Sequence, residues 1–454
     1  PNMISTMTTL DRRRFLQLMA LGSGAVLVGC VGAAPKPRAP TVVPDPTGAL
    51  ITRWRTDEFA RGSYSYLSLD NRPGDRELLA APVGDTLFFA GEATSSSNPA
   101  TAHGALMSGR DAATMLESVA VPGATVGVIG AGAAGIAAAR QLLDAGYQVV
   151  IYEGRDRIGG RVHTDTSLGV PVDLGASWLT GVKGNPMTTI ADAINAPRVP
   201  TDYENTVVYD ANGRRAGSSF WRTPFHTVNS AAREGLTIQA AIESALVDHS
   251  QRYIDRFNFA VVAIFEHEYA ADAEHLSAQA PHEGDYFGGG DAMLPNGYVE
   301  LLDALTDNLD IRLNSRVDQV VWGSNGVTLR IADQEFEHDH VVVTLPVGVL
   351  KAKAVLFEPP LPDEKQGAID RFGMGVLDKV VLEFPYRFWD QSFDSFGYIA
   401  DDRGKWAQWY DLEEVTGKPI VVAFHAGSVA DRMLGMSDDE ITAEAMTVLR
   451  TIYG

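Results

Sequence analysis

A glycine-rich turn between an apolar strand and a helix constrains the fold of this chain most. Residues 125–145 read as a β-branched strand, the turn Gly-Ala-Gly-Ala-Ala-Gly and a helix, which is a GxGxxG motif in its strand–turn–helix context. We expect Gly130 to permit the tight turn, Gly132 to let a pyrophosphate approach the backbone, and Gly135 to let helix and strand pack closely. The pattern predicts a dinucleotide-binding βαβ unit.

The residues that follow strengthen this prediction. The first turn of the helix, which includes Ala134, is expected to offer free N–H groups and a positive dipole end to phosphates. Residues 148–152 read as a second strand that ends at Glu153, about 20 residues beyond the motif, where an acid binds a ribose hydroxyl. An acid at this position disfavours NADP but does not distinguish NAD from FAD.

The length and composition limit the number of domains, the class of protein and the kind of partner. A length of 454 residues exceeds what one core usually holds, so two closely packed domains are expected. Hydrophobic residues make up 45% and charged residues 21% of the chain, as in ordinary globular proteins. The formal net charge of −21 argues against binding to nucleic acid and favours cationic partners, although an acidic surface also serves solubility alone.

The first 30 residues have the pattern of an export signal. Arginines at 12–14 precede a short apolar run, in an order that resembles a twin-arginine signal. Residues 27–30, Leu-Val-Gly-Cys, resemble a lipobox, so Cys30 is a candidate for lipid attachment; the alternative is an ordinary signal with a chance cysteine. Residues 31–45 read as a Pro-rich linker. We expect an exported protein, periplasmic or at the cell surface.

Cys30 is the only cysteine in the chain. A disulfide within the chain and a cysteine metal cluster are therefore excluded. The spacing of histidines and acids does not indicate a metal site either. Beyond residue 30, no apolar run is long enough to span a bilayer.

Two motifs after the βαβ unit resemble the flavin amine oxidase family, most closely its polyamine oxidases and lysine-specific histone demethylases. They are Gly-Arg-Asp-Arg-Ile-Gly-Gly-Arg at 154–161 and Asp-Leu-Gly-Ala-Ser-Trp at 173–178. The resemblance implies FAD as the cofactor. FAD should be non-covalent, because the residue that matches the flavin-linking cysteine of some monoamine oxidases is Ser63. The resemblance places further residues at FAD: Gly159, Gly160, Arg161, Gly175, Ala176, Ser177, Trp178 and, through its backbone at adenine, Val317.

The motifs occur in a rotated order. Residues 87–94 and 99–110 resemble the segment that closes the chain in relatives, and they place Gly91, Glu92, Thr101 and Ala102 at the flavin. Residues 46–119 as a whole match the family's C-terminal part. We therefore expect a circular permutation, which is permissible where domain termini lie close together. The alternative is a misassembled or artificial sequence.

The resemblance implies an α/β fold in which a Rossmann-type FAD-binding domain is interleaved with an α+β substrate domain. Residues 120–200 and 311–352 are assigned to the FAD domain. Residues 201–310 and 353–454 are assigned to the substrate domain, and residues 46–119 contribute to both.

Four residues are the candidates for the chemistry. Lys379 matches the family's lysine that holds a water near flavin N5, although an alternating strand pattern alone favours a lysine on an exposed face. Tyr64 matches one wall of an aromatic cage for the amine, and a core aromatic is the alternative. Asn98 stands where the family usually has the second, tyrosine wall. Thr180 stands where many polyamine oxidases have histidine and the demethylases have threonine.

The expected partners are a small-molecule amine and O2. Glu268 is a candidate for pairing with a distal substrate ammonium, or lies on a solvated helix face; Trp54 is a weaker substrate-site candidate. The resemblance implies oxidation of a primary or secondary amine, including polyamines, to an imine with release of H2O2. Two alternatives stay open: an amino-acid oxidase of the same family, for which no motif supplies a carboxylate-binding arginine, and a catalytically silent flavin-binding protein.

Overall fold

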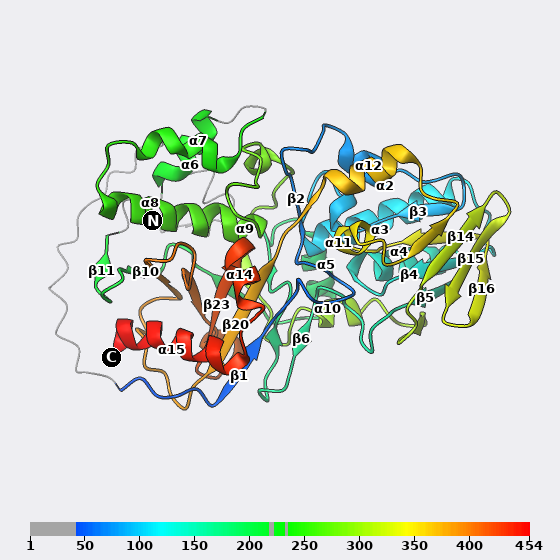
Figure 1. The fold of residues 1–454 in the computed structure, drawn as a ribbon. Coiled ribbons are helices and arrows are strands. Elements are labelled where there is room, and N and C mark those ends of the chain that lie inside the picture. Colours follow the sequence, from blue (N-terminus) through cyan, green and yellow to red (C-terminus); the bar gives the residue numbers. More distant parts are fainter. Residues whose placement is uncertain (1–41, 218–221, 232–234) are drawn as a thin grey trace, which may run out of the picture.

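The computed structural model describes residues 42–217, 222–231 and 235–454. The expected export signal and most of the expected Pro-rich linker lie outside these ranges. The described chain forms two halves that lie side by side, one built on a parallel sheet and the other on a mixed sheet (Figure 1). Among the described helices, none combines the length and the apolar character that crossing a membrane requires.

A five-stranded parallel sheet forms the centre of the first half. Most of its strands are short, mainly apolar runs, because layers cover both faces of the sheet; the edge strand at 310–312 is Asp-Ile-Arg. Helix α4 (Ala133–Asp144) connects the neighbouring strands β4 and β5 as the predicted βαβ unit. In order across the sheet, the strands are β13 (Asp310–Arg312), β5 (Gln148–Tyr152), β4 (Thr125–Ile129), β17 (His340–Val343) and β3 (Leu87–Phe89).

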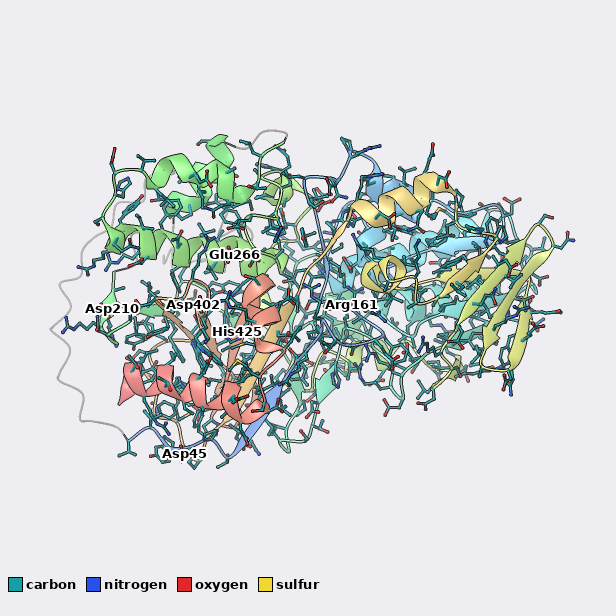
Figure 2. All side chains as sticks on the ribbon, in the orientation of Figure 1. Asp45, Arg161, Asp210, Glu266, Asp402 and His425 are labelled. Carbon is teal, nitrogen blue, oxygen red and sulfur yellow. The ribbon has the colours of Figure 1, made fainter. Side chains whose placement is uncertain are left out.

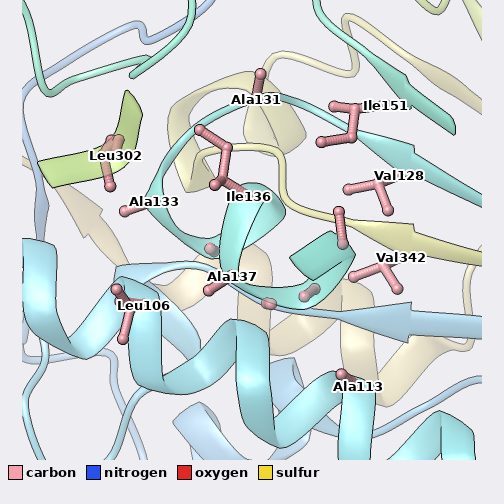
Figure 3. Close-up of a cluster of buried hydrophobic side chains, with 14 of the residues drawn as sticks. Leu106, Ala113, Val128, Ala131, Ala133, Ile136, Ala137, Ile151, Leu302 and Val342 are labelled. Carbon is pink, nitrogen blue, oxygen red and sulfur yellow. The ribbon is translucent and has the colours of Figure 1, made fainter. Parts of the chain in front are cut away.

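Different layers cover the two faces of this sheet. Helices α3 (Ala102–Glu117) and α4 cover one face with small and branched side chains (Figure 3). The two helices approach closely at Gly109, where a Cβ would lie only 2.1 Å from the carbonyl oxygen of Ala134. The other face packs against a four-stranded sheet that contains an antiparallel hairpin. Its order is β16 (Gln334–His338), β15 (Gly326–Ile331), β14 (Gln319–Gly323) and β18 (Leu356–Glu358).

A seven-stranded mixed sheet forms the centre of the second half. Helix α15 (Asp438–Tyr453) packs on one face and begins with a capping box formed by Ser437 and Glu440. On the other face, Tyr410 and Phe424 pack in a cluster with Val172 and Leu174. The strand order is β1 (Gly48–Ile51), β20 (Leu377–Glu383), β23 (Ile420–Ala426), β22 (Gln408–Asp411), β21 (Ser395–Tyr398), β10 (Thr206–Tyr209) and β11 (Arg215–Ala216).

Smaller elements complete the two halves. A three-stranded sheet has the order β8 (Trp178–Leu179), β12 (Asp291–Met293) and β9 (Val199–Thr201), and two-stranded sheets pair β2 (Ser65–Tyr66) with β19 (Gly373–Met374) and β6 (Thr164–Asp165) with β7 (Val172–Asp173). The helices are α2 (Asp75–Ala80), α5 (Pro186–Ala193), α6 (Arg222–Ala231), α7 (Ile238–Glu243), α8 (Gln251–Val261), α9 (His267–Tyr269), α10 (Glu300–Asp303), α11 (Val347–Lys351), α12 (Asp363–Arg371), α13 (Glu413–Thr416) and α14 (Gly427–Met433). Short 3-10 turns are η1 (Glu92–Thr94), η2 (Ser244–Leu246) and η4 (Ala280–His282), and η3 (Val262–Glu266) is a π-helix.

The chain passes from one half to the other more than once. Strand β1 lies at an edge of the mixed sheet beside β20, whereas β3, less than 40 residues later, lies at an edge of the parallel sheet beside β17. These pairings confirm the predicted fold class, in which a Rossmann-type domain is interleaved with an α+β domain. The rotated segment order and the domain limits remain predictions.

Candidate functional site

A cavity of about 330 Å³ is lined by residues from both halves. Its wall in the first half comes from the turn after β4, the start of α4 and the end of β5. Its wall in the second half comes from β20 and β23, and β8 contributes from the three-stranded sheet. The cavity therefore meets the carboxyl ends of parallel strands, where open α/β sheets bind ligands.

The glycines of the turn shape the first wall. Gly130 has φ of 103°, which L side chains rarely adopt. A Cβ on Gly135 would lie 1.9 Å from the carbonyl oxygen of Gly130, so α4 packs on the turn only with glycine there. A Cβ on Gly132 would meet no atom closer than 3.9 Å, which leaves this face open. Ala134, in the first turn of α4, lines the cavity, and this turn has no side-chain cap.

Glu153 follows β5 directly and lines the cavity while remaining buried. One carboxylate oxygen accepts a hydrogen bond from the Ala131 amide (2.7 Å), and the other accepts one from the Arg155 amide (2.8 Å). A carboxylate oxygen can accept more than one hydrogen bond, so both oxygens retain capacity for a hydroxyl donor. The backbone of the turn thus orients the acid toward the cavity.

Arg161 lies between the two halves (Figure 2). Its guanidinium pairs with the Glu92 carboxylate at 2.8 Å and donates to the carbonyl oxygen of Ser63. The Glu92 carboxylate also accepts from the hydroxyl of Ser65 at 2.7 Å. Although burial alone would raise the pKa of Glu92, Arg161 and Ser65 hold it below its ordinary value. An ionised Glu92 therefore fixes Arg161 in the cavity wall.

Lys379 lies on β20 and is 5% exposed. Its Nζ donates to the carbonyl oxygens of Asp173 (2.8 Å) and Gly175 (2.7 Å) and to the Oγ of Ser177 (2.5 Å). Burial lowers the pKa of Lys379 to about 8, and the Asp173 carboxylate opposes part of that shift. The lysine is therefore a buried wall residue and not a solvated residue of a strand face.

Aromatic side chains surround this end of the cavity. The ring centroids of Trp178 and Phe424 lie 5.9 Å and 5.8 Å from Lys379 Nζ. The hydroxyl of Tyr64 donates to the carbonyl oxygen of His267 at 2.9 Å, which fixes the orientation of its ring. All three rings line the cavity. Such a surface suits an amine, whether neutral or cationic.

The family model described as flavin containing amine oxidoreductase matches residues 28–116 and 133–454. The chain belongs to this family. Polyamine oxidase 2 of Arabidopsis thaliana is 34% identical over 351 residues, which are 72% of this chain and 71% of that protein. Lysine-specific histone demethylase 1 homolog 1 of the same plant is 33% identical over 357 residues, which are 72% of this chain and 42% of that protein.

Solved structures of amine oxidases share the fold. Cyclohexylamine oxidase from Brevibacterium oxydans IH-35A superposes with a TM-score of 0.57 at 21% sequence identity and covers 73% of this chain and 81% of its own. Wild-type putrescine oxidase bound to putrescine superposes with a TM-score of 0.55 at 22% sequence identity. The superposition covers 73% of this chain and 82% of that chain. At these identities, the superpositions describe the fold of this flavin amine oxidoreductase and not its substrate.

FAD is the cofactor, and the first wall fits it. The open face of Gly132 and the uncapped start of α4 suit the pyrophosphate, and Glu153 suits a ribose hydroxyl. Val317, five residues after the end of β13, also lines the cavity. When bound, FAD supplies a two-electron acceptor.

The cavity brings together almost all residues that the sequence predicted for the site. Besides Gly130, Gly132, Ala134, Glu153, Val317 and Lys379, its wall contains Trp54, Tyr64, Gly91, Glu92, Thr101, Ala102, Gly159, Gly160, Arg161, Gly175, Ala176, Ser177, Trp178, Thr180 and Glu268. Gly135 instead lies behind the turn, where it allows the close packing of α4.

Asn98 is the exception that needs correction. Its side chain is buried and donates a hydrogen bond to the carbonyl oxygen of Asp285 at 2.8 Å, and the residue is not part of the cavity wall. The Asn98 side chain is therefore directed at the Asp285 carbonyl and not at the cavity. The catalytic position expected at Asn98 is therefore not supported by the structure.

Sequence reasoning missed several wall residues. Phe424, Tyr203 and Asp291 also line the cavity, and the Phe424 ring lies 5.8 Å from Lys379 Nζ. Phe424 sits in a fully buried strand that is apolar except for His425, and this pattern gives no sign of a site. Asp291 had a detectable signal, because it follows three consecutive glycines and opens a strand with an acid.

Proposed function

We propose that this flavin amine oxidoreductase is an amine oxidase for primary or secondary amines, polyamines among them, with O2 as the electron acceptor. The amine CH–NH unit loses two electrons and two protons and becomes an imine. Water then hydrolyses the imine to a carbonyl compound and a shorter amine or ammonia. O2 takes up the two electrons and two protons and becomes H2O2.

The observation that supports this proposal is the buried Lys379 among aromatic walls at one end of a cavity whose other end fits a dinucleotide. Its pKa of about 8 gives Lys379 a neutral fraction near neutral pH, so Nζ can accept a proton there. The carbonyl oxygens of Asp173 and Gly175 accept two N–H groups of Lys379 whether its amine is protonated or neutral. The Ser177 hydroxyl can accept the third hydrogen or donate to the lone pair when that hydrogen is absent.

Tyr64 and Trp178 orient the amine and exclude water from it. The Tyr64 ring is held by its hydrogen bond to the His267 carbonyl, and the Trp178 indole donates to the Thr201 hydroxyl at 3.0 Å. Rings fixed in this way present a rigid apolar surface to the carbon that is oxidised. Positioning of this kind lowers the barrier because less motion is lost in the transition state.

Anaerobic mixing of the purified yellow protein with amines tests the proposal. Spermidine or a simple alkylamine should bleach the flavin absorbance, amino acids should not, and air should restore the colour with formation of H2O2. K379M should keep its flavin spectrum but bleach about a hundredfold more slowly, as expected for loss of a proton acceptor. Bleaching by amino acids alone would favour an amino-acid oxidase, and no bleaching by any amine would favour a silent flavin protein.

A further inference from the structure

Arg76, on α2, is a buried arginine that does not line the cavity. It is 4% exposed, and its guanidinium forms a bidentate ion pair with the Glu283 carboxylate, at 2.5 Å and 2.9 Å. Its Nη1 donates to the hydroxyl of Ser65 at 3.1 Å and to the carbonyl oxygen of Ala93 at 2.9 Å. With four hydrogen bonds in the interior, the position of this cation is fixed.

A series of contacts connects Arg76 with the cavity wall. The Ser65 hydroxyl accepts from Arg76 and donates to the Glu92 carboxylate at 2.7 Å. That carboxylate pairs with the Arg161 guanidinium at 2.8 Å, and both Glu92 and Arg161 line the cavity. Charges therefore alternate along the series, which begins at the carboxylate of Glu283 and ends at the cation of Arg161.

The Arg161 guanidinium retains donors for a bound anion. Its Nη1 donates to Glu92 and to the Ser63 carbonyl, whereas its Nε and Nη2 have no acceptor among the residues that the structure describes. Arg161 directly follows Gly160, where a Cβ would lie 3.7 Å from the Cα of Gly132. Because the open face of Gly132 suits the FAD pyrophosphate, the two free donors of Arg161 suit the same anion.

Arg76 influences the electrostatic potential at this part of the wall. The Glu92 carboxylate alone would offset the charge of Arg161, because the two groups are in contact. Although burial alone would raise the pKa of Glu92, Arg161, Ser65 and Arg76 hold it below its ordinary value, so the charge of Arg76 acts at this carboxylate. The Glu283 side chain is 17% exposed, against 5% for that of Arg76, so water screens the outer anion more.

We propose that Arg76 is a positioning residue for FAD, because its buried charge offsets that of Glu92 and leaves Arg161 with a net positive charge for the pyrophosphate. Arg76 does not line the cavity, so it acts only through Glu92 and Arg161. This inference concerns cofactor binding and is independent of the amine that is oxidised. A purely structural tie between α2 and Glu283 is the alternative.

Release of FAD from the holoenzyme, followed by the rise in flavin fluorescence after dilution, tests the proposal. R76M removes the buried charge and should release FAD about tenfold faster than the wild type. R76K keeps the charge and should stay within about threefold of the wild type. E283Q removes the outer anion and should release FAD about twofold more slowly, because less negative charge then offsets Arg76.

R371M is the matched control, because Arg371 forms a bidentate ion pair with Asp75 on the same helix and has no hydrogen bond to Glu92. It should lower the melting temperature and leave FAD release within about twofold of the wild type. Equal release from R76M and the wild type, or release from R76K or R371M as fast as from R76M, would overturn the inference. E283Q decides even if R76M does not fold: slower release supports the role of charge, whereas release at the wild-type rate or faster would leave Arg76 as a structural tie.

Discussion

At the scale of single residues, Lys379 combines burial with a complete set of hydrogen bonds. Its Nζ has three acceptors, of which two are main-chain carbonyl oxygens and the third is the Ser177 hydroxyl. Burial raises the pKa of the neighbouring Asp173 to about 6, although the Thr164 hydroxyl and the Tyr298 amide favour its ionised form. The lysine therefore holds a costly charge that the fold tolerates at one specific position.

This cost predicts how stability depends on pH. The pKa of Lys379 is about 8 in the folded chain, against 10.5 for a lysine exposed to water, so between these values the unfolded chain binds more protons. The burial penalty is complete below pH 8 and is relieved as pH rises from 8 toward 10.5. The unfolding free energy of the wild type minus that of K379M should therefore increase over this window. Urea unfolding of both proteins at about pH 7 and about pH 10 measures it, and a difference that is flat or falls with pH contradicts the assignment.

The site residues that sequence predicted are those within short motifs. Gly130, Gly132 and Glu153 belong to one local strand–turn–helix pattern whose geometry follows from its residues. Asp291 contacts Gly181 across 110 positions, and no local pattern announces such a pairing. Asn98 shows the opposite case: a matching position in a motif does not fix where a different side chain points, and that of Asn98 donates to the Asp285 carbonyl.

At the scale of elements, residues 53–61, here called the strap, close the nucleotide end of the cavity. The Asp57 carboxylate takes two hydrogen bonds from the Arg155 guanidinium, at 2.8 Å and 2.5 Å. The Phe59 ring lies against Gly154, where a Cβ would sit 2.4 Å from its edge, and 5.2 Å from the Arg155 guanidinium. The strap therefore lies over the residues that directly follow Glu153. The bidentate ion pair between Asp57 and Arg155 holds it there.

The strap predicts that cofactor retention depends on Asp57. D57N should release FAD about five- to tenfold faster than the wild type, the equivalent of ~1 kcal/mol, because the Asp57–Arg155 pair is largely sheltered from solvent. E58Q is the matched control, because the Glu58–Arg316 pair at 3.2 Å is about half exposed and should matter little. Release is followed by the rise in flavin fluorescence after dilution. Equal release from D57N and the wild type, or a larger effect of E58Q, would rule out this role.

Elements defined by local patterns were predicted more accurately than their partners. The strand–turn–helix expected at 125–145 is present as β4 and α4, and the strand expected at 148–152 is β5. The pairing of β10 with β21, almost 190 positions apart, has no local signature. The π-helix η3 could not be predicted from the sequence of residues 262–266 either, because all five residues are buried and show no periodicity.

At the scale of the whole molecule, residues 46–119 connect the halves by supplying an edge strand to each sheet, β1 and β3. The first described residues lie beside α15, where Arg450 pairs with Asp45 at 2.7 Å. At the other end of this segment, a short loop joins α3 to β4 and exposes Val119 and Val121. Both boundaries of the segment therefore lie at the surface, where the chain tolerates a new order.

This geometry predicts that a rearranged chain folds. The rearranged protein begins at residue 120, runs to 454 and continues through a short Gly-Ser linker into residues 42–119. It should bind FAD and melt within about 5 °C of the original chain, because all contacts are kept and only the entropy of loop closure changes. A control rearrangement opened inside β4, between Val126 and Gly127, breaks a central parallel strand and should lose the cofactor. Flavin absorbance per chain and thermal melting measure both proteins. A rearranged chain that is soluble but lacks flavin, or a control that binds it, would mean that the two halves depend on the present chain order and not only on the contacts between their strands.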